Sequence, residues 1–287
     1  MKSKMFIYLG IFVGFIILLS LYGFWIATHP PRYKTNLTPK DLGWKFEEIN
    51  LTTSDNIKLA AWFVENQQKS NKVVIVLHGY PFDKANILGW SQFLHKDFNL
   101  FFFDFRYFGD SQGSMTTVGF HEQKDLEAAL DYLQKRGVEN IGLMGFSLGG
   151  GVALMTAASD NRIKAIVSDS AFANVDLMID EYYQNLSVLK YPLIPLTKLW
   201  ALVFVGIDTD KISPEKSAES IKIPVLLIHS KKDQVIPFKN ALRIQKSLEA
   251  NQSAQFFFFE DGAHGGVPQH LESEYQKTVI DFFKQNL

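Results

Sequence analysis

Cysteine is absent from the 287 residues. The chain therefore contains no disulfide, no thiolate zinc site and no cysteine nucleophile. An excess of one charge is also lacking, because 29 Lys and Arg side chains are balanced by 30 Asp and Glu side chains. This balance argues against a nucleic-acid partner, which usually requires a basic surface. No group of His, Asp and Glu has the spacing of metal ligands, and no nucleotide-binding glycine motif is present, so we expect neither metal nor cofactor.

What the chain does have is a long apolar run at its N-terminus. Residues 5–27, MFIYLGIFVGFIILLSLYGFWIA, carry no charge and are long enough for a tilted membrane-spanning helix. A cleaved signal peptide and a buried helix or hairpin are the alternatives. The apolar region of a signal peptide is usually about 7–15 residues and ends in an A-x-A-like site, which is missing here. We expect residues 1–32 to be a retained anchor with its flanks.

The charges beside the anchor bear on its orientation. Lys2 and Lys4 favour an N-terminus that stays in the cytoplasm, whereas Arg32 and Lys34 on the other side weaken that bias. We expect a single-pass membrane protein whose globular part lies outside the cytoplasm.

After the anchor, the pattern predicts an α/β protein. Pro30 and Pro31 end the helix, residues 33–43 form a polar linker, and residues 44–287 form one domain. An antiparallel pair at 44–51 and 57–64 precedes short apolar strands that alternate with helical patterns, which is typical of a mostly parallel, doubly wound sheet covered on both faces. We expect strands at 73–77, 100–103, 141–144, 163–167, 225–228 and 255–259, and helices at 85–95, 121–136, 148–158, 238–248 and 270–285.

One interval interrupts this alternation. Residues 173–213 contain no clear strand and are rich in large apolar side chains, with Pro192 and Pro195 among them. The interval either packs on the core or caps a pocket, and insertions of this length are usually functional. We expect a small helical cap.

The candidate nucleophile lies between a strand and a helix. Gly145-Phe146-Ser147-Leu148-Gly149 matches the G-x-S-x-G nucleophile elbow, in which small residues let the strand and helix pack closely while the serine is exposed in a strained turn. The alternative is a structural glycine-rich loop. We expect Ser147 to be a nucleophile.

A serine nucleophile needs a base and an acid that orients the base. The elbow fold has the chain order serine, acid, histidine, and His229, His264 and His270 are the three histidines after Ser147. His264 follows the last expected strand in a glycine-containing loop, so we expect it to be the base, whereas His229 ends a strand and is expected to be structural. For the acid, Asp233 after the penultimate strand is favoured over Asp261, which is close enough to His264 in sequence to cap a turn.

An oxyanion hole is expected beside the serine. In elbow enzymes the backbone N–H after the nucleophile acts with an N–H from the loop after an earlier strand. Here these are the N–H groups of Leu148 and Tyr80, and His78 is expected to support the second loop.

Five motifs occur in a fixed order along the chain. They are HGYP (78–81), DFRYFGDS (104–111), GFSLGG (145–150), SKKDQVIP (230–237) and GAHGG (262–266). In order and spacing they resemble the oxyanion loop, the loop after the fourth strand, the elbow, the acid loop and the histidine loop of the α/β-hydrolase superfamily. Within it the chain is most similar to membrane-anchored serine esterases and serine-aminopeptidase-like members with a short helical cap. Tyr107 departs from the pattern, because glycine is usual there, and we expect it to affect loop shape rather than chemistry.

The resemblance and the residues together predict a serine hydrolase that cleaves carboxylic esters through an acyl-enzyme. The apolar cap and the anchor favour acyl-chain or lipid-like substrates. A thioesterase would use the same residues, as would a peptidase or amidase, which needs an acidic group for a substrate amine. Asp176, Asp180 and Glu181 are candidates for that group, although solvation at the surface is the favoured interpretation of all three. A non-catalytic scaffold is a further alternative, but it predicts decay of a motif, and none has decayed.

Overall fold

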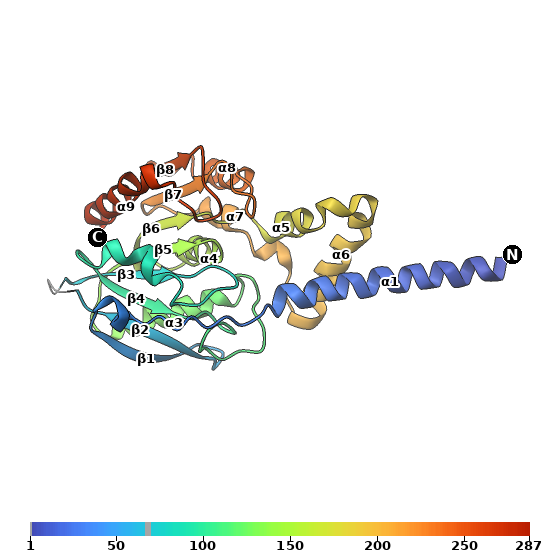
Figure 1. The fold of residues 1–287 in the computed structure, drawn as a ribbon, viewed down its shortest axis with the longest axis horizontal. Helices are drawn as coiled ribbons and strands as arrows, with labels where there is room; N and C mark the ends of the chain where they lie inside the picture. Colours follow the sequence, from blue (N-terminus) through green and yellow to red (C-terminus); the bar gives the residue numbers. More distant parts are fainter. Residues whose placement is uncertain (1, 67–69) are drawn as a thin grey trace.

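The computed structural model describes residues 2–66 and 70–287, and these form a sheet with helices on both faces (Figure 1). The sheet has eight strands in the order β1-β2-β4-β3-β5-β6-β7-β8. β2 is antiparallel to β1 and β4, and the remaining neighbours are parallel. The strands are β1 (Phe46–Thr52), β2 (Lys58–Val64), β3 (Lys72–Leu77), β4 (Asn99–Phe103), β5 (Asn140–Phe146), β6 (Ile163–Asp169), β7 (Val225–Ser230) and β8 (Ala254–Phe259).

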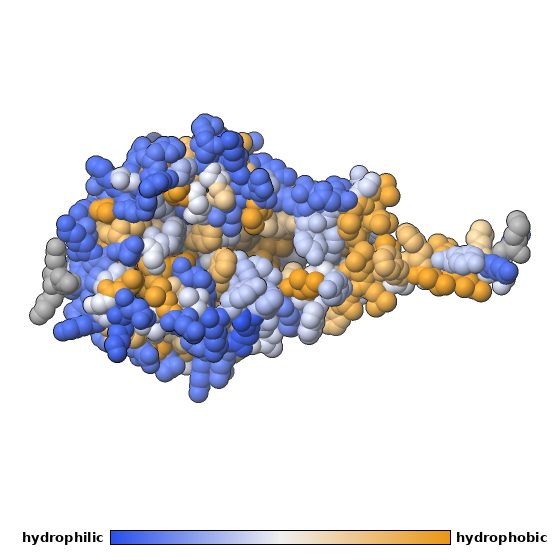
Figure 2. All heavy atoms as spheres, viewed as in Figure 1, coloured by the Kyte–Doolittle hydropathy of each residue, from blue (hydrophilic) through white to orange (hydrophobic). Residues whose placement is uncertain are grey.

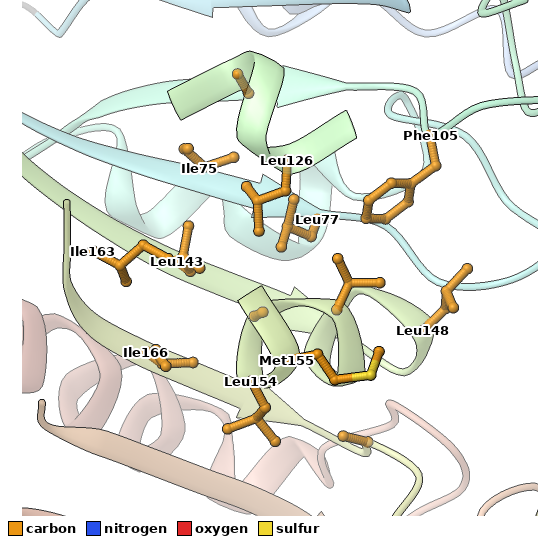
Figure 3. Packing of buried hydrophobic residues seen from close by; sticks show 14 of the residues in the cluster. Ile75, Leu77, Phe105, Leu126, Leu143, Leu148, Leu154, Met155, Ile163 and Ile166 are labelled. Atoms are coloured by element: carbon orange, nitrogen blue, oxygen red, sulfur yellow. The ribbon is translucent and has the colours of Figure 1, made fainter. Parts of the chain in front are cut away.

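Two apolar cores lie between the sheet and the helices that cover its two faces. On one face, α3 (Glu122–Lys135), α4 (Leu148–Ala157), α7 (Pro214–Ala218) and α8 (Lys239–Ser247) contribute to one core. On the other face, α2 (Leu88–Ser91) and α9 (Glu272–Asn286) contribute to the second core. Figure 3 shows Leu126 of α3 near Ile75 of the sheet and Leu154 of α4 near Ile166 of the sheet. The expected α/β-hydrolase architecture with a mostly parallel sheet is confirmed.

The helix expected at residues 85–95 was wrong in extent. This segment is a turn followed by the short α2 and a 3₁₀ turn at Gln92–Leu94. Asp83 and Asn86 hold the turn together, because each side chain accepts a hydrogen bond of 3.1 Å from the other residue's backbone N–H. Asp and Asn compete with helix formation in this way, since their side chains bond nearby backbone groups.

Helices without strands fill the chain between β6 and α7. They are α5 (Val175–Tyr182), a 3₁₀ segment (Gln184–Leu189), α6 (Lys190–Trp200), a π-helical turn (Ala201–Val205) and a 3₁₀ turn (Thr209–Lys211). We refer to residues 175–205 as the cap. The cap lies beside the N-terminal helix and at one end of the sheet (Figure 1).

The N-terminal helix α1 (Lys2–Thr28) is apolar around its circumference and long enough to cross a membrane. Its first half extends away from the domain, and its second half packs on α6 (Figure 1). Ile16, Ser20, Gly23 and Phe24 are buried, which is the spacing of one helical face. The Trp200 indole N–H donates to the Ser20 hydroxyl at 2.9 Å, so a specific contact fixes α1 against the cap.

The chain after α1 is also bound to the domain. Arg32 donates to the backbone oxygens of Gly109 and Ser111 at 3.1 and 2.7 Å. The Tyr107 hydroxyl donates to the Pro30 oxygen at 2.7 Å. Tyr107 has a φ of +73°, a left-handed conformation that favours glycine, so the departure from the motif provides a contact to the segment that follows α1. The expected boundaries of the anchor (1–32), the linker (33–43) and the domain (44–287) stay a prediction.

Candidate functional site

Ser147 lies in a strained turn between β5 and α4. Its φ is +51°, a region that costs a non-glycine residue on the order of 1–3 kcal/mol. The turn is possible because its neighbours are glycines. A Cβ on Gly145 would lie 2.3 Å from the Gly149 oxygen, and one on Gly149 would lie 2.5 Å from the Leu77 oxygen. The elbow geometry expected from the motif is therefore present.

The structure brings Asp233 and His264 together. Nδ1 of His264 lies 2.7 Å from Oδ2 of Asp233, and Oδ1 of Asp233 accepts hydrogen bonds of 2.9 Å from the N–H groups of Val235 and Ile236. The competing carboxylate of Asp261 is exposed and pairs with Lys232. The loop conformations thus place Asp233, rather than Asp261, beside His264, and the role of Asp233 as the acid stays a prediction.

The surroundings of Asp233 favour its charged form. Burial raises the pKa of this carboxyl, but the hydrogen bonds from His264, Ile236 and Val235 outweigh it, so the pKa lies below its ordinary value. His229 is fully buried, and its Nε2 lies 2.8 Å from the Ile236 oxygen. Burial lowers the pKa of His229, which agrees with a neutral structural histidine that supports the Asp233 loop.

Ser147 and His264 line the same cavity, which has a volume of about 450 Å³. The cavity lies between the end of the sheet, the cap and the end of α1. Most of its lining is apolar, so it suits a ligand that is largely hydrocarbon. The apolar lining includes Ile26, Ala27, Val118, Leu148, Phe172, Val175, Met178, Ile179, Tyr182, Val235, Ile236 and Pro237.

Tyr80 and Leu148 also line this cavity. Leu148 is the first residue of α4, where a helix has free N–H groups and a positive dipole end. Within residues 2–66 and 70–287, neither the Tyr80 nor the Leu148 N–H donates to another protein group. His78 stabilises the Tyr80 loop, since its Nε2 accepts from the Phe105 N–H at 3.0 Å and its Nδ1 lies 2.9 Å from the Gly79 oxygen.

The sequence did not predict the place of three features in this site. The first is α1, whose Gly23, Ile26 and Ala27 form part of the cavity wall. The second is Glu181, which is buried in the cavity wall rather than solvated. Its Oε1 pairs with Lys239 at 2.9 Å, and its Oε2 has no partner in the described part of the chain. Neither the position of α1 against the cavity nor the burial of a single cap carboxylate is marked by a sequence motif, so no local signal identifies either.

The third feature is Asp169 at the end of β6. Its backbone oxygen accepts from the Ser147 N–H at 2.8 Å, and its buried carboxylate accepts from the hydroxyls of Ser170 and Tyr275, both at 2.9 Å. Burial raises the pKa of Asp169 to about 6, although both hydroxyls lower it. The ionised form is therefore disfavoured directly behind the elbow.

We expect Asp169→Asn to change the pH dependence of stability. A carboxyl whose pKa is about 6 when folded and about 3.9 when unfolded takes up protons on folding, so the unfolding free energy falls as pH rises from about 4 to 6. The loss is on the order of 2–3 kcal/mol. The variant lacks this loss and should gain stability relative to the parent between pH 4.5 and 7.5. Thermal unfolding of both proteins at these two pH values tests this, and parallel Tm profiles would contradict it.

No metal site accompanies these residues in the described ranges, which contain no group of three His, Asp or Glu side chains able to hold an ion. The cavity wall combines a strained serine, a histidine paired with a buried carboxylate, and two backbone N–H groups that have no protein acceptor in the described ranges.

Comparisons with known proteins agree with this geometry. Residues 72–188 match the family model of the α/β hydrolase fold, and residues 191–285 match that of the dienelactone hydrolase family. The chain is 27% identical to YfhR of Salmonella typhi, covering 97% of this chain and 95% of that protein. It is 24% identical to bem46 of Schizosaccharomyces pombe, covering 87% and 80%.

Solved structures give the same assignment. The Pyrococcus furiosus esterase Pf2001 superposes with a TM-score of 0.75 at 28% identity, over 91% of this chain and 98% of that chain. An acylaminoacyl peptidase of Pyrococcus horikoshii superposes with a TM-score of 0.63 at 20% identity, over 85% of this chain and 42% of that one, which shows the shared fold alone. With its sheet order, its elbow and these matches, the chain belongs to the α/β-hydrolase superfamily.

Proposed function

We propose that this hydrolase cleaves carboxylic esters, with Ser147 as nucleophile, His264 as base and Asp233 as the residue that orients His264. The observation that carries the proposal is that Ser147 and the Asp233-paired His264 line one apolar cavity. The likeness to the Pyrococcus furiosus esterase supports it.

The proposed reaction has two steps. Nε2 of His264 takes the proton of the Ser147 hydroxyl as Oγ attacks the ester carbonyl, and the N–H groups of Tyr80 and Leu148 stabilise the oxyanion. The intermediate collapses to an acyl-enzyme, and the alcohol leaves with the proton from His264. A water molecule then attacks the acyl-enzyme, with His264 again as base, and releases the carboxylic acid and free Ser147.

The lining of the cavity favours an acyl chain or another lipid-like group. Ile26 and Ala27 of α1 form one side, and apolar cap residues such as Met178 and Ile179 form another. We propose that α1 anchors the enzyme in a membrane as a retained single-pass helix with the hydrolase domain outside the cytoplasm. The contact of α1 with the cavity supports retention, because cleavage of the helix would remove part of the wall.

A peptidase or amidase is the second candidate, and Glu181 favours it. This carboxylate lines the cavity with one oxygen unpaired, so it could accept hydrogen bonds from a substrate ammonium. Asp176 and Asp180 instead pair with Lys198 and Lys190. A thioesterase would use the same residues as the esterase, and the assay below separates the three.

The test is hydrolysis of p-nitrophenyl esters of increasing acyl length by the full chain in detergent, since α1 lines the cavity. We expect turnover with an optimum at a medium or long acyl chain. Ala27→Trp should fill part of the cavity and move the optimum to shorter chains. Gly10→Trp is the matched control on the same helix, because no atom approaches within 4 Å of a Cβ built there, and it should leave the optimum unchanged.

A fluorophosphonate probe and alternative substrates distinguish the esterase from the thioesterase, the peptidase and the scaffold. Labelling of Ser147 without ester turnover would refute the esterase and direct attention to acyl thioesters and aminoacyl amides, with loss of amide turnover in Glu181→Gln supporting a peptidase. A folded protein with neither labelling nor turnover would contradict the hydrolase proposal and leave the scaffold.

A further inference from the structure

We infer that the cap is part of the membrane attachment, with its outer face immersed in the bilayer beside α1. This inference rests on the proposed membrane anchoring by α1 and goes beyond it, because it places the mouth of the cavity at the lipid surface.

The first observation is the length of α1 that projects from the domain without a buried residue. Ile16 is the first buried residue of the helix. The apolar stretch from Met5 to Phe15 rises only about 16 Å at about 1.5 Å per residue, which is about half of the 30 Å hydrocarbon core. The whole run from Met5 to Ala27 rises about 34 Å. A helix that spans the bilayer must therefore bring into it the turns that pack on α6.

The second observation is the composition of the cap surface. Residues 184–205 form the second stretch in the described chain that is long and apolar enough to cross a membrane. Its only charged residues are Lys190 and Lys198, and both pair with carboxylates of α5. The exposed large apolar side chains of this stretch are Leu186, Val188, Tyr191, Leu199, Leu202, Val203 and Phe204.

Figure 2 shows how hydrophobic residues are distributed on one face of the molecule. They predominate over the cap and along much of the projecting length of α1, with paler and hydrophilic residues toward the N-terminal end of the helix, whereas hydrophilic residues dominate the surface over the sheet domain. An extended exposed apolar surface of this kind marks a contact site. One end of this apolar surface is α1, a helix of membrane-spanning length. A lipid bilayer is therefore the partner that fits the surface of both α1 and the cap.

The consequence concerns the substrate. Ile26 and Ala27 line the cavity at the end of α1 that leaves the bilayer. With the cap immersed, the cavity walls formed by α1 and the cap lie at the lipid surface, so an acyl chain can enter the cavity from the membrane without crossing bulk water. Substrates held in the membrane should therefore be used in preference to soluble short-chain esters.

The absence of cysteine allows a direct test with single-cysteine variants. We would place an environment-sensitive fluorophore at Val203→Cys and at Tyr191→Cys, which are 60% and 69% exposed, in the full chain reconstituted into phosphatidylcholine vesicles. Phe15→Cys is the control inside the proposed span, and Leu242→Cys on α8, 48% exposed, is the control on the sheet domain. We expect blue-shifted emission and loss of fluorescence with brominated lipids at positions 203, 191 and 15, but not at 242.

Each other outcome overturns the inference in a distinguishable way. Quenching at position 15 but not at 203 and 191 means that only α1 is embedded. Blue-shifted emission at 203 and 191 without quenching means that a second copy of the chain covers the cap. No quenching at any position refutes the membrane anchoring itself. Ester turnover measured on the same vesicles reports separately on the hydrolase proposal.

Discussion

Replacement of Ser147 by alanine is expected to lower kcat for a p-nitrophenyl ester by about 10⁶-fold, to the level left by the oxyanion hole and binding alone. His264→Ala should have a similar effect, because the serine hydroxyl is unreactive without its base. Asp233→Asn should cost about 10⁴-fold, since the histidine loses the partner at Nδ1 that fixes its tautomer. The measurement is steady-state hydrolysis by the purified full chain.

Matched controls separate these roles from general damage. His270 is exposed, and Asp261 pairs with Lys232 at the surface. His270→Ala and Asp261→Asn should each keep kcat within about twofold of the parent. An inactive Asp261→Asn together with an active Asp233→Asn would show that Asp261, and not Asp233, orients His264. Turnover by Ser147→Ala at the parental rate would refute the mechanism in which Ser147 is the nucleophile.

Replacement of Arg106 by methionine is expected to destabilise the fold by about 3–5 kcal/mol, the usual cost of leaving a buried charge without its partner. Nε and Nη2 of Arg106 donate to Oδ1 of Asp125 at 2.9 and 2.7 Å, and Nη1 donates to Asp55 at 2.8 Å. The Asp125 side chain is wholly buried. Thermal unfolding should show a Tm lower by about 10 °C.

Arg136→Met is the control for this effect. Arg136 also donates two hydrogen bonds to a carboxylate, that of Glu47, but both side chains are considerably exposed. Exposed ion pairs contribute about 1 kcal/mol or less, so the Tm should change by only a few degrees. Equal losses in the two variants would show that burial does not set the strength of the Arg106 pair. Asp125→Leu in the Arg106→Met background should recover part of the loss, because it removes the unpaired charge.

Much of the fold follows from local sequence patterns. Continuous β-branched and aromatic runs such as Val73–Leu77 are buried on both faces, and this pattern predicts central parallel strands. The failure at residues 85–95 has a local cause, since Asp83 and Asn86 stabilise a turn by side-chain hydrogen bonds that hydrophobic periodicity does not reveal.

Some residues of the candidate site could likewise be identified from the sequence, whereas the contacts of others depend on tertiary packing. Ser147 is identified by its glycine neighbours, because the steric limits of the elbow act within a few residues of chain. Asp233 and His264 are nominated by their positions after strands, but their 2.7 Å contact depends on the packing of two loops. The raised pKa of Asp169 and the place of Glu181 in the cavity wall both result from burial. The presence of a single carboxylate in a sequence does not predict that burial.

The sequence by itself determined the α/β architecture, the elbow serine, the acid and base candidates and an apolar helix of membrane-spanning length. These are properties of short segments, set by hydrophobic periodicity, glycine sterics and motif order. Only the tertiary structure decided that α1 packs on the cap and lines the cavity, and that Glu181 is buried there. Those facts arise from contacts between residues far apart in the chain, such as Ser20 with Trp200 and Glu181 with Lys239, and no local pattern encodes which apolar surface a helix will meet.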